Sequence, residues 1–300
     1  MNSEPDWNLY RTFLAVAEEG SLSGAARRLG LTQPTVARHI DALEQSVGAD
    51  LFMRSQRGLA PTDLALDLAP YAQTLASNAA ALMRTASGGA GEVRGSVRIS
   101  ASEVIGVERL PPILTRLRRA HPALVIELVL SNALDDLLRR EADIAVRNVA
   151  PAQEALVARR LPPIELGLYA RGDYLELRGA PAGLEDLAQH DLIGFDQATP
   201  ALRALAERFP QLDRAAFALR ADSDLAQLAA LRAGYGIGMC QVGVAERDAD
   251  LVRVLAGSVA IELGLWIVMH EDLKTSARCR AVFDALVAGL QPARAGSGIG

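Results

Sequence analysis

The segment from Ser23 to Leu59 constrains the fold of this chain more than any other part of it. It reads SGAARRLGLTQPTVARHIDALEQSVGADLFMRSQRGL. Gly30 separates two helix-forming stretches, and Thr32 is placed to cap the second one. Pro34 is tolerated in the first turn because the early amides of a helix have no intrahelical partner. The segment therefore predicts a short helix, a tight turn, a longer helix and then a basic, hairpin-like loop.

The longer predicted helix has one apolar face and one polar face. Its apolar residues recur at helical spacing and are expected to face inward: Val36, Ile40, Leu43 and Val47. Gln33 lies in the first turn, where a recognition helix in the major groove reaches base edges. Gln can pair with adenine and Arg38 with guanine, and the Thr35 methyl can meet a thymine methyl. The pattern indicates a helix that reads DNA.

The elements on either side support this interpretation. Asp6 can cap a preceding helix that ends at Gly20, and either Ser21 or Ser23 can cap the next one. After the longer helix, LFMRSQRGL places Arg54 and Arg57 on a turn that contains glycine. Such arginines suit phosphates or a narrow minor groove.

A helix pair with a glycine turn also occurs in ordinary helical domains, so the wider pattern decides. The stretches FLAVAEEGSLSGAARRLGLTQPTVARHIDALEQSVGADLFMR and RGLAPT closely resemble the winged helix-turn-helix of the LysR-type transcriptional regulators. The family commonly has Thr-Glu-Ala-Gly where this chain has Thr62–Ala65, which implies a stiffer junction. The resemblance implies double-stranded promoter or operator DNA as a partner. The expected DNA-binding residues are Ser23, Arg28, Thr32, Gln33, Pro34, Thr35, Arg38, His39, Arg54 and Arg57.

After Val93, β-like runs alternate with helical runs, which predicts βαβ units around a mainly parallel sheet. We expect crossover strands near Ile164–Ala170 and Leu263–Met269. The resemblance extends through the whole chain. It implies an effector-binding domain similar in fold to periplasmic solute-binding proteins, with a cleft between two lobes.

The expected fold class is α+β multidomain, with an N-terminal winged helix-turn-helix, a linker helix and a C-terminal two-lobed α/β domain. The SGGAGE run at 87–92 is typical of a flexible hinge. The expected boundaries are 1–62 for the DNA-binding domain, 63–86 for the linker helix, 87–92 for the hinge and 93–295 for the effector-binding domain. Within the last, lobe I takes about 93–162 and 269–295, and lobe II about 163–268.

The linker helix carries a stripe with 4-3 spacing, formed by Leu64, Leu68, Tyr71, Leu75, Asn78 and Leu82. Such a stripe is typical of a coiled coil, in which a polar residue can fix the register. Packing against its own domain is the alternative. The family resemblance favours pairing of subunits, which predicts a homodimer or homotetramer. Pro70 is expected to weaken the helix locally.

Polar side chains follow the predicted strands of the effector domain. Ligands of α/β sheets bind beyond the carboxyl ends of strands, and helix N-termini there favour anions. The expected effector-binding residues are Ser100, Ser102, Ser131, Asn132, Arg147, Gln197, Thr199 and Ser223. Each hydroxyl alone is more often a helix cap, but together they indicate a polar, anion-tolerant cleft. Glu103, beside the serines, argues against a dianionic effector. For Arg147, the alternative to contact with the effector is an ion pair with a neighbouring carboxylate.

Other classes of protein find little support in the sequence. The net charge is −5, MNSEPDWNLY has no signal-peptide pattern, and no apolar run reaches the roughly 18 residues that span a bilayer. We therefore expect a cytoplasmic protein without a membrane partner.

The residues of metal, redox and catalytic sites are also sparse. Cys240 and Cys279 are expected to be buried structural thiols rather than a redox pair. The four histidines are scattered, AGYGIGM lacks dinucleotide spacing, and no nucleophile elbow occurs, so no metal, cofactor or enzymatic activity is expected. The expected function is a transcriptional regulator whose promoter binding or activation is controlled by a small-molecule effector. The alternative is a solute-binding module without a regulatory response.

Overall fold

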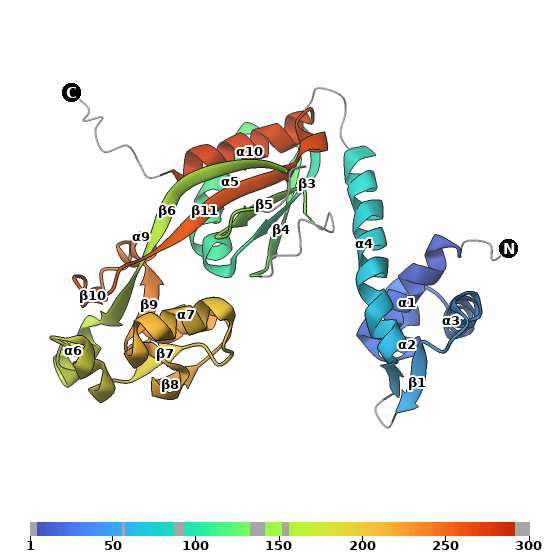
Figure 1. Cartoon of the computed structure of the whole chain (residues 1–300). Helices are drawn as coiled ribbons and strands as arrows, with labels where there is room; N and C mark the ends of the chain where they lie inside the picture. Colours follow the sequence, from blue (N-terminus) through green and yellow to red (C-terminus); the bar gives the residue numbers. More distant parts are fainter. Residues whose placement is uncertain (1–4, 56–57, 87–92, 133–141, 152–155, 292–300) are drawn as a thin grey trace. The chain divides into compact units, whose positions relative to one another are not determined.

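The computed structural model describes residues 5–55, 58–86, 93–132, 142–151 and 156–291. The chain divides into two compact units, the first formed by residues 1–86 with 138–141 and the second by 87–137 with 142–300. Figure 1 follows the chain through both. The expected hinge at 87–92 and the helical run at 134–141 lie outside the described residues.

Unit 1 begins with three helices: α1 at Trp7–Glu19, α2 at Leu22–Leu29 and α3 at Gln33–Val47. Each ends at a glycine in the left-handed region, where a side chain would be strained. The expected start signals are confirmed, because Asp6 and Thr32 accept hydrogen bonds from first-turn amides. Ser21, not Ser23, caps α2, accepting from Gly24 N at 3.1 Å.

The inward faces of these helices form the core of unit 1. Val36, Ile40 and Leu43 of α3 are buried as predicted. The expected fourth member, Val47, is 39% exposed and is the last residue of α3. Strands β1 (Phe52–Ser55) and β2 (Gly58–Pro61) pair as an antiparallel hairpin, the expected wing.

Helix α4 extends over Asp63–Ala86 and continues through Pro70. Its predicted stripe divides into two parts. Leu64 and Leu68 are half-buried against the core of unit 1, as the alternative interpretation has it. The remainder of the stripe is exposed and consists of Tyr71, Leu75, Asn78 and Leu82.

Unit 2 is built on a seven-stranded sheet in the order β10-β6-β11-β5-β3-β4, with β9 paired to β6. Its strands are β3 (Gly95–Ala101), β4 (Leu124–Leu130), β5 (Ile144–Arg147), β6 (Leu156–Arg171), β9 (Gly238–Gln241), β10 (Leu251–Val254) and β11 (Ile261–His270). Within this sheet, among the described strands, β3 is parallel to β4 and to β5 and the other four pairs are antiparallel, so the expectation of a mainly parallel sheet is wrong. The long strands β6 and β11 run antiparallel to each other, and the strands that pair with them are antiparallel too.

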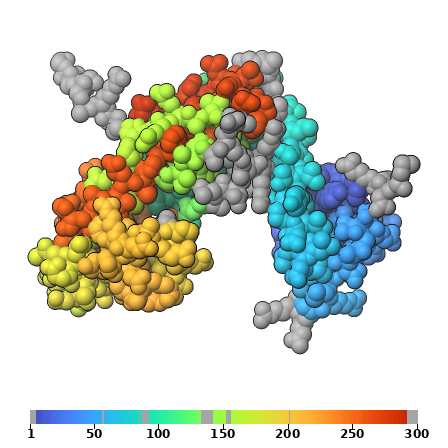
Figure 2. All heavy atoms as spheres, in the orientation of Figure 1, coloured from blue at the N-terminus to red at the C-terminus, as the bar shows by residue number. Residues whose placement is uncertain are grey.

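The two lobes of unit 2 have separate cores. In lobe I, α5 (Leu110–Ala120) and α10 (Ala277–Leu290) pack on the sheet, and the π-helix η1 (Ile105–Arg109) precedes α5. Lobe II contains the short parallel pair β7 (Leu192–Gly194) and β8 (Phe217–Arg220). Its helices are α6 (Gly172–Arg178), α7 (Pro200–Arg208), α8 (Asp224–Arg232) and α9 (Val242–Ala245), with a 3-10 helix at Leu184–Gln189. In Figure 2 the yellow and orange atoms of lobe II gather at one end of the unit.

Strands β6 and β11 run from one lobe into the other, as predicted for the crossover strands (Figure 1). Their register shifts at one point, where Pro162 and Pro163 of β6 lie opposite Gly264 of β11. Two residues opposite one form a β-bulge, which bends the strand. Asn148 donates a hydrogen bond to the carbonyl oxygen of Gly264 at 3.0 Å and anchors the bulge.

Candidate functional site

The N-terminal turns of α3 present the predicted base-reading residues. Gln33, Pro34 and Arg38 are exposed, and Thr35 is half-buried. The hydroxyls of Thr32 and Thr35 lie 2.8 Å apart, so Thr35 is held against the cap of its own helix. This leaves a polar end of α3 with an amide, a guanidinium and a threonine methyl, the groups that read base edges in a major groove.

Two other predicted DNA-binding residues are engaged within unit 1. Arg28 of α2 forms ion pairs with Glu18 and with Glu19, the latter at 3.6 Å. His39 of α3 is half-buried, and its Nδ1 lies 2.8 Å from Oγ1 of Thr12 on α1. Arg28 thus connects α2 to α1, and His39 connects α3 to α1.

The wing and the start of α2 supply the remaining candidates. Arg54 is exposed on β1, and Ser23 is exposed in the first turn of α2. Arg57 lies outside the described residues. The amide of Leu59 donates to the carbonyl oxygen of Gly20 at 2.8 Å, which ties the hairpin to the end of α1. Arg54 is therefore carried on a wing whose base is held by the helical core.

In lobe I, the structure brings two predicted effector-binding residues into direct contact. Ser100 is 1% exposed and lies near the end of β3, and Arg147, 4% exposed, ends the neighbouring β5. The guanidinium of Arg147 donates to Oγ of Ser100 at 2.6 Å and to the carbonyl oxygen of Val146, the preceding residue, at 3.2 Å. Ser102 and Ser131 directly follow β3 and β4, and both are half-buried.

A second group of predicted residues connects the two lobes. Asn132 donates from Nδ2 to Asp224 at 2.9 Å and accepts from the amide of Glu103 at 3.2 Å. Ser223 caps α8 and donates its hydroxyl proton to Oε2 of Glu103 at 2.9 Å. Burial raises the pKa of Asp224 and the nearby Glu103 carboxylate raises it further, against the hydrogen bond from Asn132, which lowers it.

The last two predicted effector-binding residues lie apart from these groups. Thr199 caps α7 by accepting from the amide of Leu202 at 3.3 Å, and Gln197 donates its amide to Asp222 at 2.9 Å. Both side chains are exposed. Among the described residues, neither is hydrogen-bonded to Ser100, Arg147 or Glu103. Thr199 is therefore a helix cap, the role that a single hydroxyl at a strand end more often has.

Sequence reasoning missed a bidentate polar contact between the lobes. Arg232 of α8 donates to both carboxylate oxygens of Glu108 on η1, at 2.7 and 3.1 Å, and to Asp248 at 3.2 Å. The hydrogen bond from Arg232 holds the pKa of Glu108 below its ordinary value. The two residues are 124 positions apart, and neither belongs to a motif. Only the fold could bring them together.

The two cysteines are buried as predicted, Cys240 on β9 and Cys279 on α10. Burial raises the pKa of the Cys240 thiol to about 11. A thiol that stays protonated near neutral pH is a poor nucleophile. Within the described ranges, no group of three or more His, Cys, Asp or Glu side chains is arranged to hold a metal ion.

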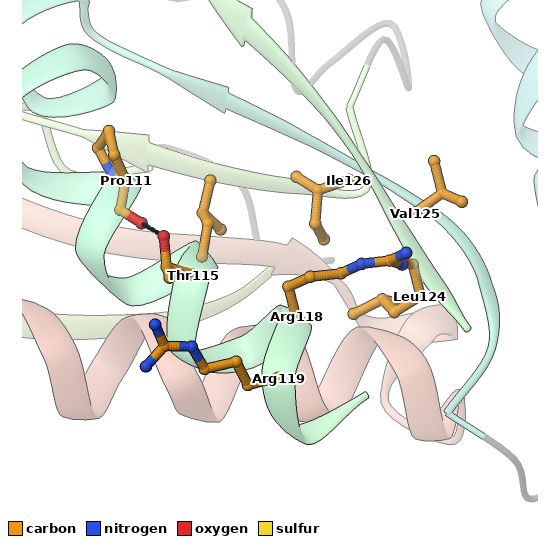
Figure 3. A pocket seen from close by; sticks show the side chains of 8 residues that line it. Pro111, Thr115, Arg118, Arg119, Leu124, Val125 and Ile126 are labelled. Carbon is orange, nitrogen blue, oxygen red and sulfur yellow. Dashed lines mark hydrogen bonds between the residues drawn. The ribbon is translucent and has the colours of Figure 1, made fainter. Parts of the chain in front are cut away.

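A hollow of about 780 Å³ lies over α5 and β4. It is lined by Pro111, Leu114, Thr115, Arg118, Arg119, Leu124, Val125 and Ile126 (Figure 3). None of these is a predicted effector-binding residue, so this hollow is separate from the groups around Ser100 and Glu103.

Residues 7–66 match the model of the bacterial regulatory helix-turn-helix protein of the lysR family, and residues 90–291 match the LysR substrate binding domain. The probable HTH-type transcriptional regulator LtrA of Klebsiella pneumoniae is 26% identical over 305 residues, 99% of this chain and 98% of that protein. An HTH-type transcriptional regulator of Xanthomonas campestris is 30% identical over 189 residues, 62% of this chain and 54% of that protein.

Solved structures show the same architecture over nearly the whole chain. CrgA, a LysR-type transcriptional regulator from Neisseria meningitidis, superposes with a TM-score of 0.59 at 24% identity, covering 95% of this chain and 99% of that one. Full-length CbnR in complex with its target DNA gives 0.65 at 20% identity, covering 94% and 99%.

A winged helix-turn-helix followed by a two-lobed substrate-binding domain defines a DNA-binding transcriptional regulator rather than an enzyme. Both parts match models of a single family, over 7–66 and 90–291. The chain belongs to the LysR family of bacterial helix-turn-helix regulators, and the predicted fold class and regulatory function are confirmed. No helix within the described ranges is long and apolar enough to cross a membrane.

Proposed function

We propose that this regulator reads its operator with Gln33, Thr35 and Arg38 in the major groove and contacts the DNA backbone with Arg54. The observation that carries the proposal is the exposure of Gln33, Pro34 and Arg38 on the first turns of a capped α3. Because Arg28 and His39 have partners inside unit 1, their part in DNA binding is to hold the helices in place.

The experiment compares specific with non-specific DNA binding. The full chain first selects its preferred duplex from a random library. Gln33→Ala and Arg38→Ala are then measured on that duplex and on a scrambled one at the same salt concentration. We expect a loss of about 1–3 kcal/mol for each lost base contact on the selected duplex only. Arg119→Ala, an exposed arginine of unit 2, is the matched control. Equal losses on both duplexes contradict base reading.

We also propose that the effector binds between the lobes, next to Ser100 and Arg147. Arg147 supplies buried positive charge beside a serine hydroxyl at the ends of β5 and β3, which supports a ligand with one anionic group. A thermal-shift screen of small metabolites identifies the ligand, and Ser100→Ala should remove its effect while DNA binding persists. A ligand that stabilises Ser100→Ala as much as the wild type contradicts this placement.

Subunits are proposed to pair through the exposed part of the α4 stripe, giving a homodimer or homotetramer. Tyr71 and Leu82 are 72% and 66% exposed, although both are large and at least partly apolar. Exposed apolar stripes of this kind mark interaction surfaces. The alternative of a solute-binding module without a regulatory response is not favoured, because residues 7–66 match the DNA-binding family model.

A further inference from the structure

Glu103 lies in lobe I, two residues after the end of β3, but its carboxylate reaches lobe II. Its Oε2 accepts a hydrogen bond from the hydroxyl of Ser223 at 2.9 Å and one from the amide of Leu225 at 3.3 Å. The backbone amide of Glu103 is itself held by Asn132 Oδ1 at 3.2 Å. The backbone of Glu103 is thus held in lobe I, and its carboxylate is bound by the first turn of α8 and its cap.

The first turn of α8 is the part of this helix that attracts negative charge, because its amides lack intrahelical partners and the helix dipole is positive there. Ser223 satisfies one of these amides, accepting from Ala226 at 3.4 Å. Glu103 satisfies another and adds a full negative charge. Among the described residues Glu103 forms no ion pair, so the donors of α8 are what offsets its charge.

The far end of α8 is held from the same segment of lobe I. Arg232, in the last turn, donates to Glu108 of η1. Arg247, which follows α9, donates to the carbonyl oxygen of Glu108 at 2.8 Å. Residues 103–108 therefore contact α8 at both ends, which fixes the position of its N-terminus relative to β3.

We propose that Glu103 is a resident anionic ligand of the α8 N-terminus, which ties the two lobes together and excludes a free carboxylate or phosphate from that end of the cleft. The proposal rests on the proposed position of the effector between the lobes. It narrows the class of effector. The anionic group of the effector belongs at the end of the cleft formed by Ser100 and Arg147. The part of the effector nearest α8 is neutral or donates hydrogen bonds. An effector with two anionic groups, one at each end of the cleft, is therefore excluded.

The experiment uses the full chain and inorganic phosphate as the probe. The thermal midpoint of unit 2 is followed as phosphate replaces chloride at constant ionic strength. For the wild type, any phosphate-specific rise in the thermal midpoint should come from Ser100 and Arg147 alone and disappear in Ser100→Ala. Glu103→Ala vacates the helix end, and we expect an additional saturable rise of about 2–4 °C. Glu103→Gln, which keeps the acceptor oxygen in place, should behave like the wild type. Glu103→Ser replaces Glu103→Ala if the latter does not fold.

Two double variants locate the new phosphate site. Adding Ser223→Ala to Glu103→Ala should abolish the additional rise, whereas adding Ser100→Ala should leave it unchanged. The proposal is overturned if wild type and Glu103→Ala respond alike, or if the additional rise follows Ser100 instead of Ser223. The phosphate-dependent thermal midpoint involves neither DNA nor the natural effector. The result therefore tests the role of Glu103 separately from the proposed function.

Discussion

The Oγ1 of Thr12 and the Nδ1 of His39 lie 2.8 Å apart and join α1 to the recognition helix α3. Thr12 also donates its hydroxyl proton to the carbonyl oxygen of Asn8 at 2.8 Å. Because a hydroxyl has only one proton, Thr12 accepts in its bond with His39, and Nδ1 of His39 carries the hydrogen. In neutral His39, Nε2 is therefore an acceptor and cannot donate to a DNA phosphate.

Removing this acceptor should destabilise unit 1. Thr12→Val keeps the shape of a buried side chain but leaves the Nδ1–H of His39 without its partner, which should cost about 1–3 kcal/mol of unfolding free energy. Urea unfolding followed by the fluorescence of Trp7, in a Trp266→Phe background, reports on unit 1. Thr74→Val is the matched control, because Thr74 donates only to a carbonyl oxygen four residues earlier in α4. Equal losses in both variants would assign the cost to the backbone hydrogen bond alone.

Arg54→Ala should flatten the salt dependence of DNA binding. Arg54 is exposed on the wing, and one lost phosphate contact lowers the slope of log K against log salt by about 0.9 on duplex DNA. Affinities for selected and scrambled duplexes, measured from 50 to 200 mM salt, provide the slope. Arg119→Ala is the control. An unchanged slope for Arg54→Ala shows that this side chain does not contact a phosphate.

Substitutions on the exposed part of the α4 stripe should dissociate the subunits. Leu75 and Leu82 are exposed, so Leu75→Ser with Leu82→Ser should leave the fold of the protomer intact while removing apolar contact area. Leu66→Ser is the matched control, since Leu66 is 57% exposed on the opposite face of the helix. Molar mass from light scattering, measured against protein concentration, gives the result. A mass that falls equally in the control would place the interface elsewhere on α4.

Glu108→Gln should lower the unfolding free energy of unit 2 at neutral pH, and the loss should be smaller at acid pH. The pKa of Glu108 is lowered in the folded protein by its hydrogen bonds from Arg232, so this group stabilises the fold above its unfolded pKa near 4.5. That contribution is lost as the pH falls through the lower, folded value. Glu108 is 16% and Arg232 36% exposed, and we expect about 1 kcal/mol at pH 7. Urea midpoints of wild type and variant should converge as the pH drops further below 4.5.

Neither cysteine should react with a thiol reagent in the native protein at pH 8. The pKa of Cys240 is raised to about 11 by burial, and Cys279 is fully buried. A chromogenic disulfide reagent should detect both thiols in guanidinium and none in buffer. Because the folded pKa of Cys240 lies above the unfolded one, its contribution to stability is lost as the pH rises from about 9 to about 11. Cys240→Ala should reduce that loss, and rapid native labelling would contradict the burial.

The local elements of this protein follow from its sequence, whereas the contacts between distant segments do not. The caps at Asp6 and Thr32 and the helix-ending Gly20 act within a few residues, so their roles were predictable. The direction of β6 depends on a crossing between lobes, which local alternation cannot show. For the same reason Ser100 and Arg147 were predictable as strand-end residues, but their 2.6 Å contact was not.

The bulge at Pro162, Pro163 and Gly264 has a mechanical consequence. Proline has no amide hydrogen, so β6 offers two consecutive positions without a backbone donor inside lobe I, where Leu161 and Ile164 on either side of the pair are buried in the core of that lobe. Bending at this point breaks no hydrogen bond from those positions. Sliding is different, because a shift of one residue would turn the buried side chains of the shifted strand outward. The bulge therefore lets the two long strands curve within lobe I while their register stays locked.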